Sequence, residues 1–256
     1  MNLDAELEAI RQQAAQLYGV PAEIHPEDMI WQYLLHHRIF PNPEAAVRHY
    51  FSDGAESARK LETIVREHLP SVTSNRKVTI LEFASGYGMV TRHLANMPIQ
   101  SRLMACDIHE HAVEFIRDRL NQVAIMSRHV PEDVAFDETF DVVFALSFFS
   151  HMPEGTFKRW LVALFAAVRP GGILVFTTHG LVSRRFFGEI ALNDDGFWFK
   201  PTSEQTDLDA AEYGSSVTSP AYVVAQLAQV AGSSLAEFRR GFWWRHQDLY
   251  VLSRPT

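Results

Sequence analysis

The first 70 residues carry hydrophobic positions at the spacing of amphipathic helices. Apolar residues recur at alternating steps of four and three residues, which places them on one face of a helix that ends near Gly19. They are Leu3, Leu7, Ile10, Ala14 and Leu17. Further helical stretches are predicted at residues 27–38, 44–50 and 55–69, the first of them stopped by Pro41. Because this part of the chain has no strand pattern, we predict a helical cap over residues 1–70.

From Lys77 onward, short apolar runs alternate with helical stretches. We predict strands at residues 78–83, 102–107, 123–126, 140–146, 173–178, 235–242 and 248–252. Helices are predicted at residues 88–97, 110–121, 156–168 and 221–231, and a polar loop at residues 192–218. This alternation is typical of a parallel sheet covered by helices on both faces. Residues 71–256 are therefore predicted to form a Rossmann-like α/β domain, whose mostly parallel seven-stranded sheet ends in an antiparallel C-terminal edge.

Composition and charge narrow the classes of function. The chain has 31 acidic and 23 basic residues, and a net charge of -8 disfavours binding to a phosphate backbone, so we expect no nucleic-acid substrate. No apolar stretch approaches the roughly 18 to 20 residues that span a bilayer, and the start lacks a signal peptide, so we expect a cytoplasmic protein. Cys106 is the only cysteine, which excludes an internal disulfide, and we expect no metal site. The oligomeric state stays open.

The turn after the first predicted strand has the composition of a cofactor-binding turn. Small residues at Ala84, Gly86 and Gly88 let the backbone approach a ligand closely, and the helix that follows presents unpaired N–H groups. Asp107 closes the second predicted strand, where a carboxylate can accept hydrogen bonds from the hydroxyls of a ribose. Both features lie at the carboxyl ends of strands, where open α/β sheets bind ligands.

Two cofactor classes use this geometry, and the residues favour one of them. A dinucleotide-binding turn has a third glycine, but Met89 occupies that position. Glu82 would repel a pyrophosphate and suits a ligand with positive charge. The sequence therefore favours S-adenosylmethionine over a nicotinamide cofactor, and an S-adenosylmethionine-dependent methyltransferase over a nicotinamide-dependent oxidoreductase. A cofactor-binding module without turnover stays open as an alternative.

The motifs resemble those of class I S-adenosylmethionine-dependent methyltransferases. Residues 82–88 resemble the E-x-G-x-G-x-G turn of that family, with Ala84 in place of the first glycine, and residues 140–152 and 169–175 resemble its fourth and fifth strands. The family's acid before the fourth strand has no clear equivalent. The resemblance implies a cofactor site formed by Glu82, Ala84, Ser85, Gly86, Gly88, Asp107, Ile108 and Ser147, with Tyr50 of the cap lying over the cofactor.

Two histidines are candidates for a general base. His151 follows the fourth strand and His179 the fifth, at the ends where a ligand would bind. Residues 147–152 and 177–180 resemble segments of bacterial methyltransferases of polysaccharide or other small-molecule biosynthesis. We therefore expect a small-molecule or sugar acceptor with a hydroxyl group, deprotonated by His151 or, as the second candidate, His179. We also expect the cap to close over the donor site.

Overall fold

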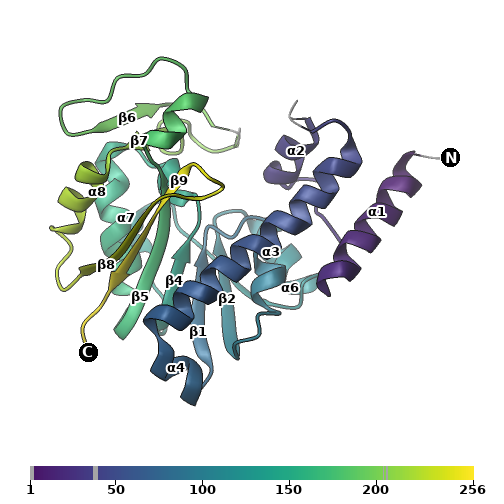
Figure 1. The fold of residues 1–256 in the computed structure, drawn as a ribbon, viewed down its shortest axis with the longest axis horizontal. Helices are drawn as coiled ribbons and strands as arrows, with labels where there is room; N and C mark the ends of the chain where they lie inside the picture. Colours follow the sequence, from purple (N-terminus) through teal and green to yellow (C-terminus); the bar gives the residue numbers. More distant parts are fainter. Residues whose placement is uncertain (1–2, 37–39, 204, 206) are drawn as a thin grey trace. The chain divides into compact units, whose positions relative to one another are not determined.

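The computed structural model describes residues 3–36, 40–203, 205 and 207–256 of the chain (Figure 1). It divides into two compact units, residues 1–126 and residues 127–256. This division falls after the third strand, whereas the sequence predicts a boundary at residue 70. The helices of the predicted cap thus belong to the same unit as the first strands, and each unit is described by itself below.

Four helices begin the first unit. They are α1 (Leu3–Tyr18), α2 (Met29–His36), α3 (Pro43–His68) and α4 (Pro70–Asn75). The helix predicted to end near Gly19 is confirmed, since α1 ends at Tyr18, and the predicted end of the second helix at Arg38 lies outside the described residues. The side chain of Asn42 caps α3 by accepting the N–H of Ala45 at 2.9 Å, and Pro43 takes the first helical position.

The prediction of two separate helices at residues 44–50 and 55–69 is wrong, because α3 is continuous. Residues on both sides of Gly54, such as Phe51 and Leu61, are fully buried along one face, and this shared burial outweighs the weak helix propensity of a glycine. Gly54 is needed where α3 passes another segment. A Cβ there would lie 2.3 Å from the carbonyl oxygen of Met89 and 2.7 Å from Cδ2 of His93.

Three parallel strands follow in the first unit, in the order β3-β2-β1. They are β1 (Val78–Phe83), β2 (Ser101–Asp107) and β3 (Val123–Met126), all close to their predicted positions. Helix α6 (Glu110–Asp118) is also close to prediction, but α5 (Thr91–Leu94) is shorter than the predicted helix at residues 88–97. The turn after β1 continues to Val90, so residues 88–90 are not free to join the helix.

In the second unit, the strands of the main sheet follow the order β4-β5-β9-β8. β4 (Phe140–Ala145) is parallel to β5 (Val168–His179), which pairs antiparallel with β9 (Gln247–Ser253), and β8 (Ser234–Trp243) pairs antiparallel with β9. The predicted antiparallel edge is therefore confirmed. Helix α7 (Glu154–Ala166) contacts β5, and α8 (Pro220–Leu227) contacts β8. Three short 3-10 helices complete the unit, η1 (Pro131–Asp133), η2 (Phe148–Ser150) and η3 (Leu181–Phe186).

Two parts of the second unit differ from the prediction. β5 begins at Val168 rather than Ile173, because the backbone partners change from Phe140↔Val168 to Val142↔Ile173 and the intervening residues bulge out of register. The polar stretch predicted as a loop contains a two-stranded hairpin, β6 (Phe197–Lys200) paired with β7 (Ser215–Thr218). Among the described residues, no helix combines the length and apolar character that a membrane crossing requires.

We expect Gly54→Ala to destabilise the protein by about 1 to 3 kcal/mol, because the new methyl group would overlap the carbonyl of Met89. The same change in an open helix normally stabilises by roughly 0.5 to 1 kcal/mol. Gly155 in α7 is the matched control, since a Cβ there would meet nothing within 4 Å. Urea denaturation measures both variants, and equal stabilisation by the two substitutions would contradict the close approach.

Candidate functional site

The turn after β1 holds three residues in the left-handed backbone region. The φ angles are +57° at Ala84, +54° at Gly86 and +80° at Gly88. Gly88 has no alternative, because a Cβ would lie 2.4 Å from Cδ1 of Leu120. At Ala84 the left-handed conformation costs more than it would for glycine, the residue that the resembled motif has at this position. Residues 84–86 are half-buried, so this part of the turn can be reached by a ligand.

Asp107, at the end of β2, is bound to this turn. Its buried carboxylate accepts the N–H of Gly86 at 2.7 Å through Oδ2 and the N–H of His109 at 3.0 Å through Oδ1, and Nδ1 of His109 lies 2.8 Å from the same Oδ1. An ionised carboxylate offers about four acceptor positions, so these bonds leave capacity for hydroxyl donors. The carboxylate therefore fits a ribose, and it also orients the glycine turn.

Glu82, a second carboxylate near the glycine turn, lies near the end of β1 and is buried. Its Oε2 accepts the hydroxyl of Thr91 at 2.6 Å. Burial, with a smaller contribution from the nearby charge of Asp107, raises the pKa of Glu82 to about 8, although the hydrogen bond from Thr91 opposes this shift. Without a cation nearby the side chain is therefore mostly protonated at neutral pH. A positively charged ligand would favour the ionised form.

The structure places Tyr50 inside the packing of the helices. Its side chain is fully buried, and its hydroxyl donates to Oδ2 of Asp28 at 2.7 Å. The guanidinium of Arg92 lies 5.4 Å from the centre of its ring. Tyr50 thus joins α3 to the start of α2, and its expected contact with the cofactor stays a prediction. Ile108 follows β2 and is half-buried, and its role also stays a prediction.

Ser147, in the second unit, has a left-handed backbone conformation that hydrogen bonds stabilise. Its φ is +60°, and its N–H donates to the hydroxyl of Thr177 at 2.8 Å. Thr177 donates to Gln247 at 2.6 Å, and the amide of Gln247 donates back to the hydroxyl of Ser147 at 2.8 Å. This closed set of hydrogen bonds connects the ends of β4, β5 and β9 and holds Ser147 in place.

Three histidines form a row at the ends of the same strands. The ring centres of His151 and His179 are 6.0 Å apart, and those of His179 and His246 are 5.8 Å apart. His151 also stacks on Tyr213, with ring centres at 4.5 Å and an angle of 7° between the planes. The two candidate bases predicted from sequence are therefore neighbours, and a third histidine extends the row.

The hydrogen bonds of these rings define their tautomers. Nδ1 of His151 lies 2.8 Å from the carbonyl oxygen of Gly214, and Nδ1 of His179 lies 3.2 Å from that of Ser216. A carbonyl can only accept, so both Nδ1 atoms carry the proton, and in the neutral ring Nε2 keeps its lone pair. Nδ1 of His246 lies 3.1 Å from the hydroxyl oxygen of Ser183. Because this hydroxyl donates its proton to the carbonyl of His246 at 2.9 Å, Nδ1 of the ring is the donor to the hydroxyl oxygen.

Two of the three rings are poor bases. Burial lowers the pKa of His179 to about 3, with a further contribution from His151. Burial and the charge of Arg185 lower the pKa of His246 to about 4. Both rings are therefore neutral at physiological pH, but they bind a proton weakly. Catalysis by a general base is most effective when its pKa is near the working pH, which argues against His179 and His246 as the base.

The hairpin missed in the sequence holds these histidines. Gly214 both accepts from the ring of His151 and donates its N–H to the His151 carbonyl at 3.0 Å. The hydroxyl of Ser216 donates to the carbonyl of Phe149 at 3.1 Å. The aromatic run at residues 197–199 has high strand propensity and is the signal that could have predicted the first strand of the hairpin. Its partner, residues 215–218, consists of small and β-branched residues.

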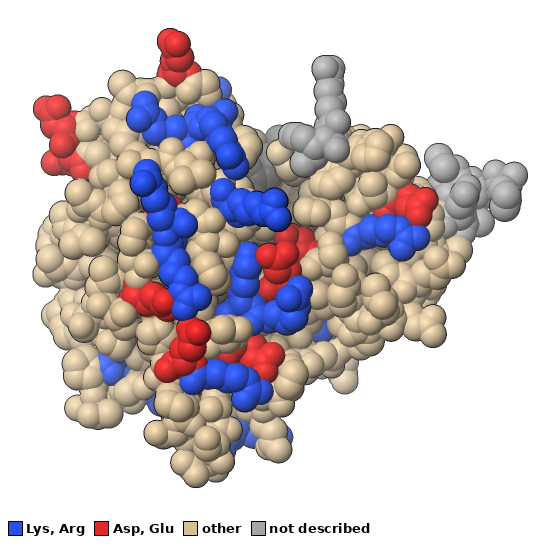
Figure 2. All heavy atoms as spheres, in the orientation of Figure 1, with Lys and Arg blue, Asp and Glu red and all other residues tan. Residues whose placement is uncertain are grey.

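Arginines near the histidine row interact within their own segment. Arg184 and Arg185 in η3 and Arg245 after β8 are exposed. The guanidinium of Arg184 donates to the carbonyl of Ile190 at 2.7 Å, and that of Arg185 lies 4.8 Å from the ring centre of Phe186. Figure 2 shows basic and acidic side chains side by side on one face of the molecule.

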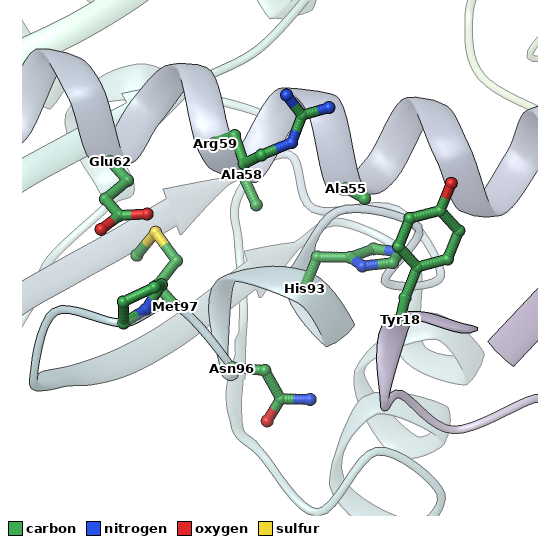
Figure 3. A pocket seen from close by; sticks show the side chains of 9 residues that line it. Tyr18, Ala55, Ala58, Arg59, Glu62, His93, Asn96 and Met97 are labelled. Atoms are coloured by element: carbon green, nitrogen blue, oxygen red, sulfur yellow. The ribbon is translucent and has the colours of Figure 1, made fainter. Parts of the chain in front are cut away.

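A separate cavity of about 180 Å³ lies beside α3 (Figure 3). Tyr18, Ala58 and Met97 line it together with His93, whose ring lies edge-on to Tyr18 at 5.5 Å. Burial lowers the pKa of His93 to about 3, so the ring is neutral. None of the residues predicted for cofactor binding or catalysis lines this cavity. The glycine turn and the histidine row therefore lie outside this cavity.

Comparisons with known proteins identify a domain and a fold. Residues 81–174 match the model of a family described as a methyltransferase domain. A comparison with curated protein sequences found no match. The solved structure of the glycopeptide N-methyltransferase MtfA complexed with S-adenosyl-L-methionine is 15% identical, with a TM-score of 0.55, over 79% of this chain and 95% of that chain.

Two further solved structures have similar folds. CalS10, an amino pentose methyltransferase from Micromonospora echinaspora, is 17% identical, with a TM-score of 0.56, over 82% of this chain and 95% of that chain. A 1,6-didemethyltoxoflavin-N1-methyltransferase from Burkholderia thailandensis is 12% identical, with a TM-score of 0.55, over 92% of this chain and 94% of that chain. At these identities the similarity shows a shared fold.

The strand order β3-β2-β1-β4-β5-β9-β8, mostly parallel with an antiparallel edge, is that of the Rossmann-like methyltransferase fold. The predicted fold class is therefore confirmed. Residues 81–174 match a methyltransferase domain, and the fold is one that S-adenosylmethionine-dependent methyltransferases adopt. Both findings favour S-adenosylmethionine over a nicotinamide cofactor.

We expect Glu82→Gln to change how the stability of the ligand-free protein depends on pH. Between the ordinary pKa of 4.5 and the raised pKa of about 8, the folded state keeps a proton that the unfolded state has lost, so stability falls as the pH rises. The slope is about 1.4 kcal/mol per pH unit at most, and the glutamine variant lacks it. Urea denaturation at several pH values measures this. Parallel curves for the two proteins would contradict the raised pKa, and the exposed Glu114→Gln is the control.

Proposed function

We propose that this methyltransferase transfers a methyl group to a hydroxyl of a small molecule or sugar, with His151 as the general base. One observation carries the proposal. The Nδ1 proton of His151 is donated to the carbonyl of Gly214, so the neutral ring presents a lone pair on Nε2. A hydroxyl acceptor needs such a group, because it must lose its proton when it is methylated.

In this proposal, the residues of the glycine turn bind the donor. Asp107 accepts hydrogen bonds from the ribose hydroxyls, and the backbone at Ala84, Ser85, Gly86 and Gly88 allows the cofactor to approach closely. Glu82 supplies negative charge opposite the positively charged part of the cofactor. S-adenosylmethionine brings its own electrophile as a methyl group on a sulfonium, so the protein mainly has to bind and orient the reactants.

The histidine row then acts on the acceptor. His151 takes the acceptor proton, and the stacking on Tyr213 and the bond to Gly214 keep its ring in one orientation. His179 is less suited, because its lowered pKa makes it a weak base. Ser147, held by Thr177 and Gln247, is proposed to fix the end of β4 beside this row. Orientation of reacting groups can supply on the order of 7 to 11 kcal/mol of the barrier reduction.

An amine acceptor is the second candidate. Of the solved structures with the same fold, MtfA is named a glycopeptide N-methyltransferase and the Burkholderia enzyme an N1-methyltransferase. CalS10 is named an amino pentose methyltransferase, which supports a sugar as acceptor. Fold similarity alone does not carry the acceptor over, so an assay should offer sugars and small molecules with hydroxyl groups and with amino groups.

We expect Asp107→Asn to weaken binding of S-adenosylhomocysteine by about 10- to 150-fold, because a charge-assisted hydrogen bond contributes roughly 1.5 to 3 kcal/mol. Isothermal calorimetry measures this. The substitution should weaken binding of 2′-deoxy and 3′-deoxy analogues less than binding of the full ligand, since each analogue lacks one of the two hydroxyls that donate to the carboxylate. An unchanged affinity for the full ligand would remove the ribose assignment.

We expect His151→Gln to lower kcat by roughly a hundredfold or more, with donor affinity near that of the wild type, because only the proton acceptor is lost. Release of S-adenosylhomocysteine in the presence of the acceptor measures turnover. His246→Gln is the matched control, since its ring lies at the other end of the row. Wild-type turnover of the His151 variant would eliminate His151 as the base, and exclusive methylation of nitrogen would eliminate the hydroxyl.

A further inference from the structure

The loop between α1 and α2 is attached to the glycine turn at two places. The first attachment is Arg92, which is almost fully buried. Its Nε donates to the carbonyl of Gly88 at 3.0 Å, and its Nη1 donates to the carbonyls of Pro21 and Glu23, each at 2.8 Å. This side chain therefore fixes the first half of the loop to the end of the turn.

The second attachment is Tyr87, the residue between the two glycines. The ring of His25 stacks on it, with ring centres at 4.6 Å and an angle of 13° between the planes. The hydroxyl of Tyr87 donates to Oε2 of Glu27 at 3.3 Å. Both partners belong to the second half of the loop, so the turn and the loop are joined by an aromatic stack and a hydrogen bond.

Glu27 also connects the loop to α6. The same Oε2 atom lies 2.7 Å from Nδ1 of His111. The hydrogen bond to His111 lowers the pKa of Glu27 and raises that of His111, so a charged pair is favoured. Because the side chains of Glu27 and His111 are 57% and 63% exposed, the contribution of this pair is modest. It nevertheless places the carboxylate where Tyr87 can reach it.

Tyr87 lies between Gly86 and Gly88, and its side chain is therefore the one through which this segment can pack against neighbours. The two glycines gain no packing energy and have the largest backbone freedom to lose, so their conformation has to be imposed by neighbours. Tyr87 is 8% exposed and its ring centre is 6.3 Å from that of Phe115 in α6. The orientation of the Gly86 N–H toward Asp107 therefore depends on how Tyr87 is held.

We propose that Tyr87 is a positioning residue, and that the loop residues His25 and Glu27 hold it so that the glycine turn keeps the conformation that binds the donor. This inference rests on the proposed role of the turn in cofactor binding. It assigns to the N-terminal helices a part in donor affinity that acts through the backbone of the turn. No loop side chain has to touch the cofactor for this effect.

A double-mutant cycle with S-adenosylhomocysteine as the probe tests the proposal. Tyr87→Phe keeps the ring stack and removes only the hydroxyl, and Glu27→Ala removes its partner. Each single change should weaken binding by about three- to tenfold, the equivalent of one net hydrogen bond. Because both variants break the same bond, the double variant should lose no more than the larger single loss.

Glu23→Ala is the matched control. Its carboxylate lies 3.4 Å from Arg119, so it joins the same loop to the residue that ends α6 without touching Tyr87. This variant should bind like the wild type. Hydrogen exchange of the ligand-free proteins gives a second measurement, and amides of residues 84–88 should exchange several-fold faster in Tyr87→Phe than in Glu23→Ala.

The outcomes separate this inference from the proposed function. If the wild type binds the probe and both single variants stay within twofold of it, the positioning role of Tyr87 is overturned while the donor site stands. Multiplicative losses in the double variant would also overturn it, since they would mean independent effects. A wild type that does not bind S-adenosylhomocysteine would overturn the assignment of the turn and this inference together.

Discussion

The hydrogen bond from the Gly86 N–H to the Asp107 carboxylate is the interaction on which the proposed donor site depends. It joins the turn after β1 to the end of β2 at 2.7 Å, in a place where the carboxylate is almost fully buried. A buried carboxylate is stable only when it accepts hydrogen bonds, and a turn with two glycines keeps one conformation only when neighbours restrain it. The bond between Gly86 and Asp107 does both. The same oxygen atoms retain acceptor positions for a ligand.

The helices that precede the sheet restrain the same turn. Arg92 and Tyr87 extend from the turn region to the loop between α1 and α2, and Gly54 allows α3 to pass close to Met89. This explains why the first compact unit includes the helices and the first three strands together. In physical terms, the helical residues complete the core around the turn, and the contacts of Tyr87 with His25 and Glu27 restrain the backbone of the turn.

In the second unit, hydrogen bonds to main-chain carbonyls define the chemistry of the histidines. The carbonyl oxygen of Gly214, just before β7, accepts a hydrogen bond from the ring of His151, and that of Ser216 in β7 accepts one from the ring of His179. These carbonyls therefore determine which ring nitrogen carries the proton. Burial then separates the rings by basicity, since it lowers the pKa of His179 and His246. Two of the three rings in the row are therefore neutral at physiological pH.

The sequence by itself determined the strand and helix pattern, the glycine turn and the acid at the end of the second strand. These features depend on local periodicity and on short motifs, which is why the bounds of β1 and β3 and the antiparallel edge agree with prediction. Only the tertiary structure decided that α3 is continuous, that residues 197–218 contain a hairpin, and that His246 joins His151 and His179. These outcomes depend on contacts between residues far apart in the chain, such as Gly54 with Met89 and His151 with Gly214. Local propensity carries no record of such contacts, because the burial and hydrogen bonds that decide them exist only once the chain has folded.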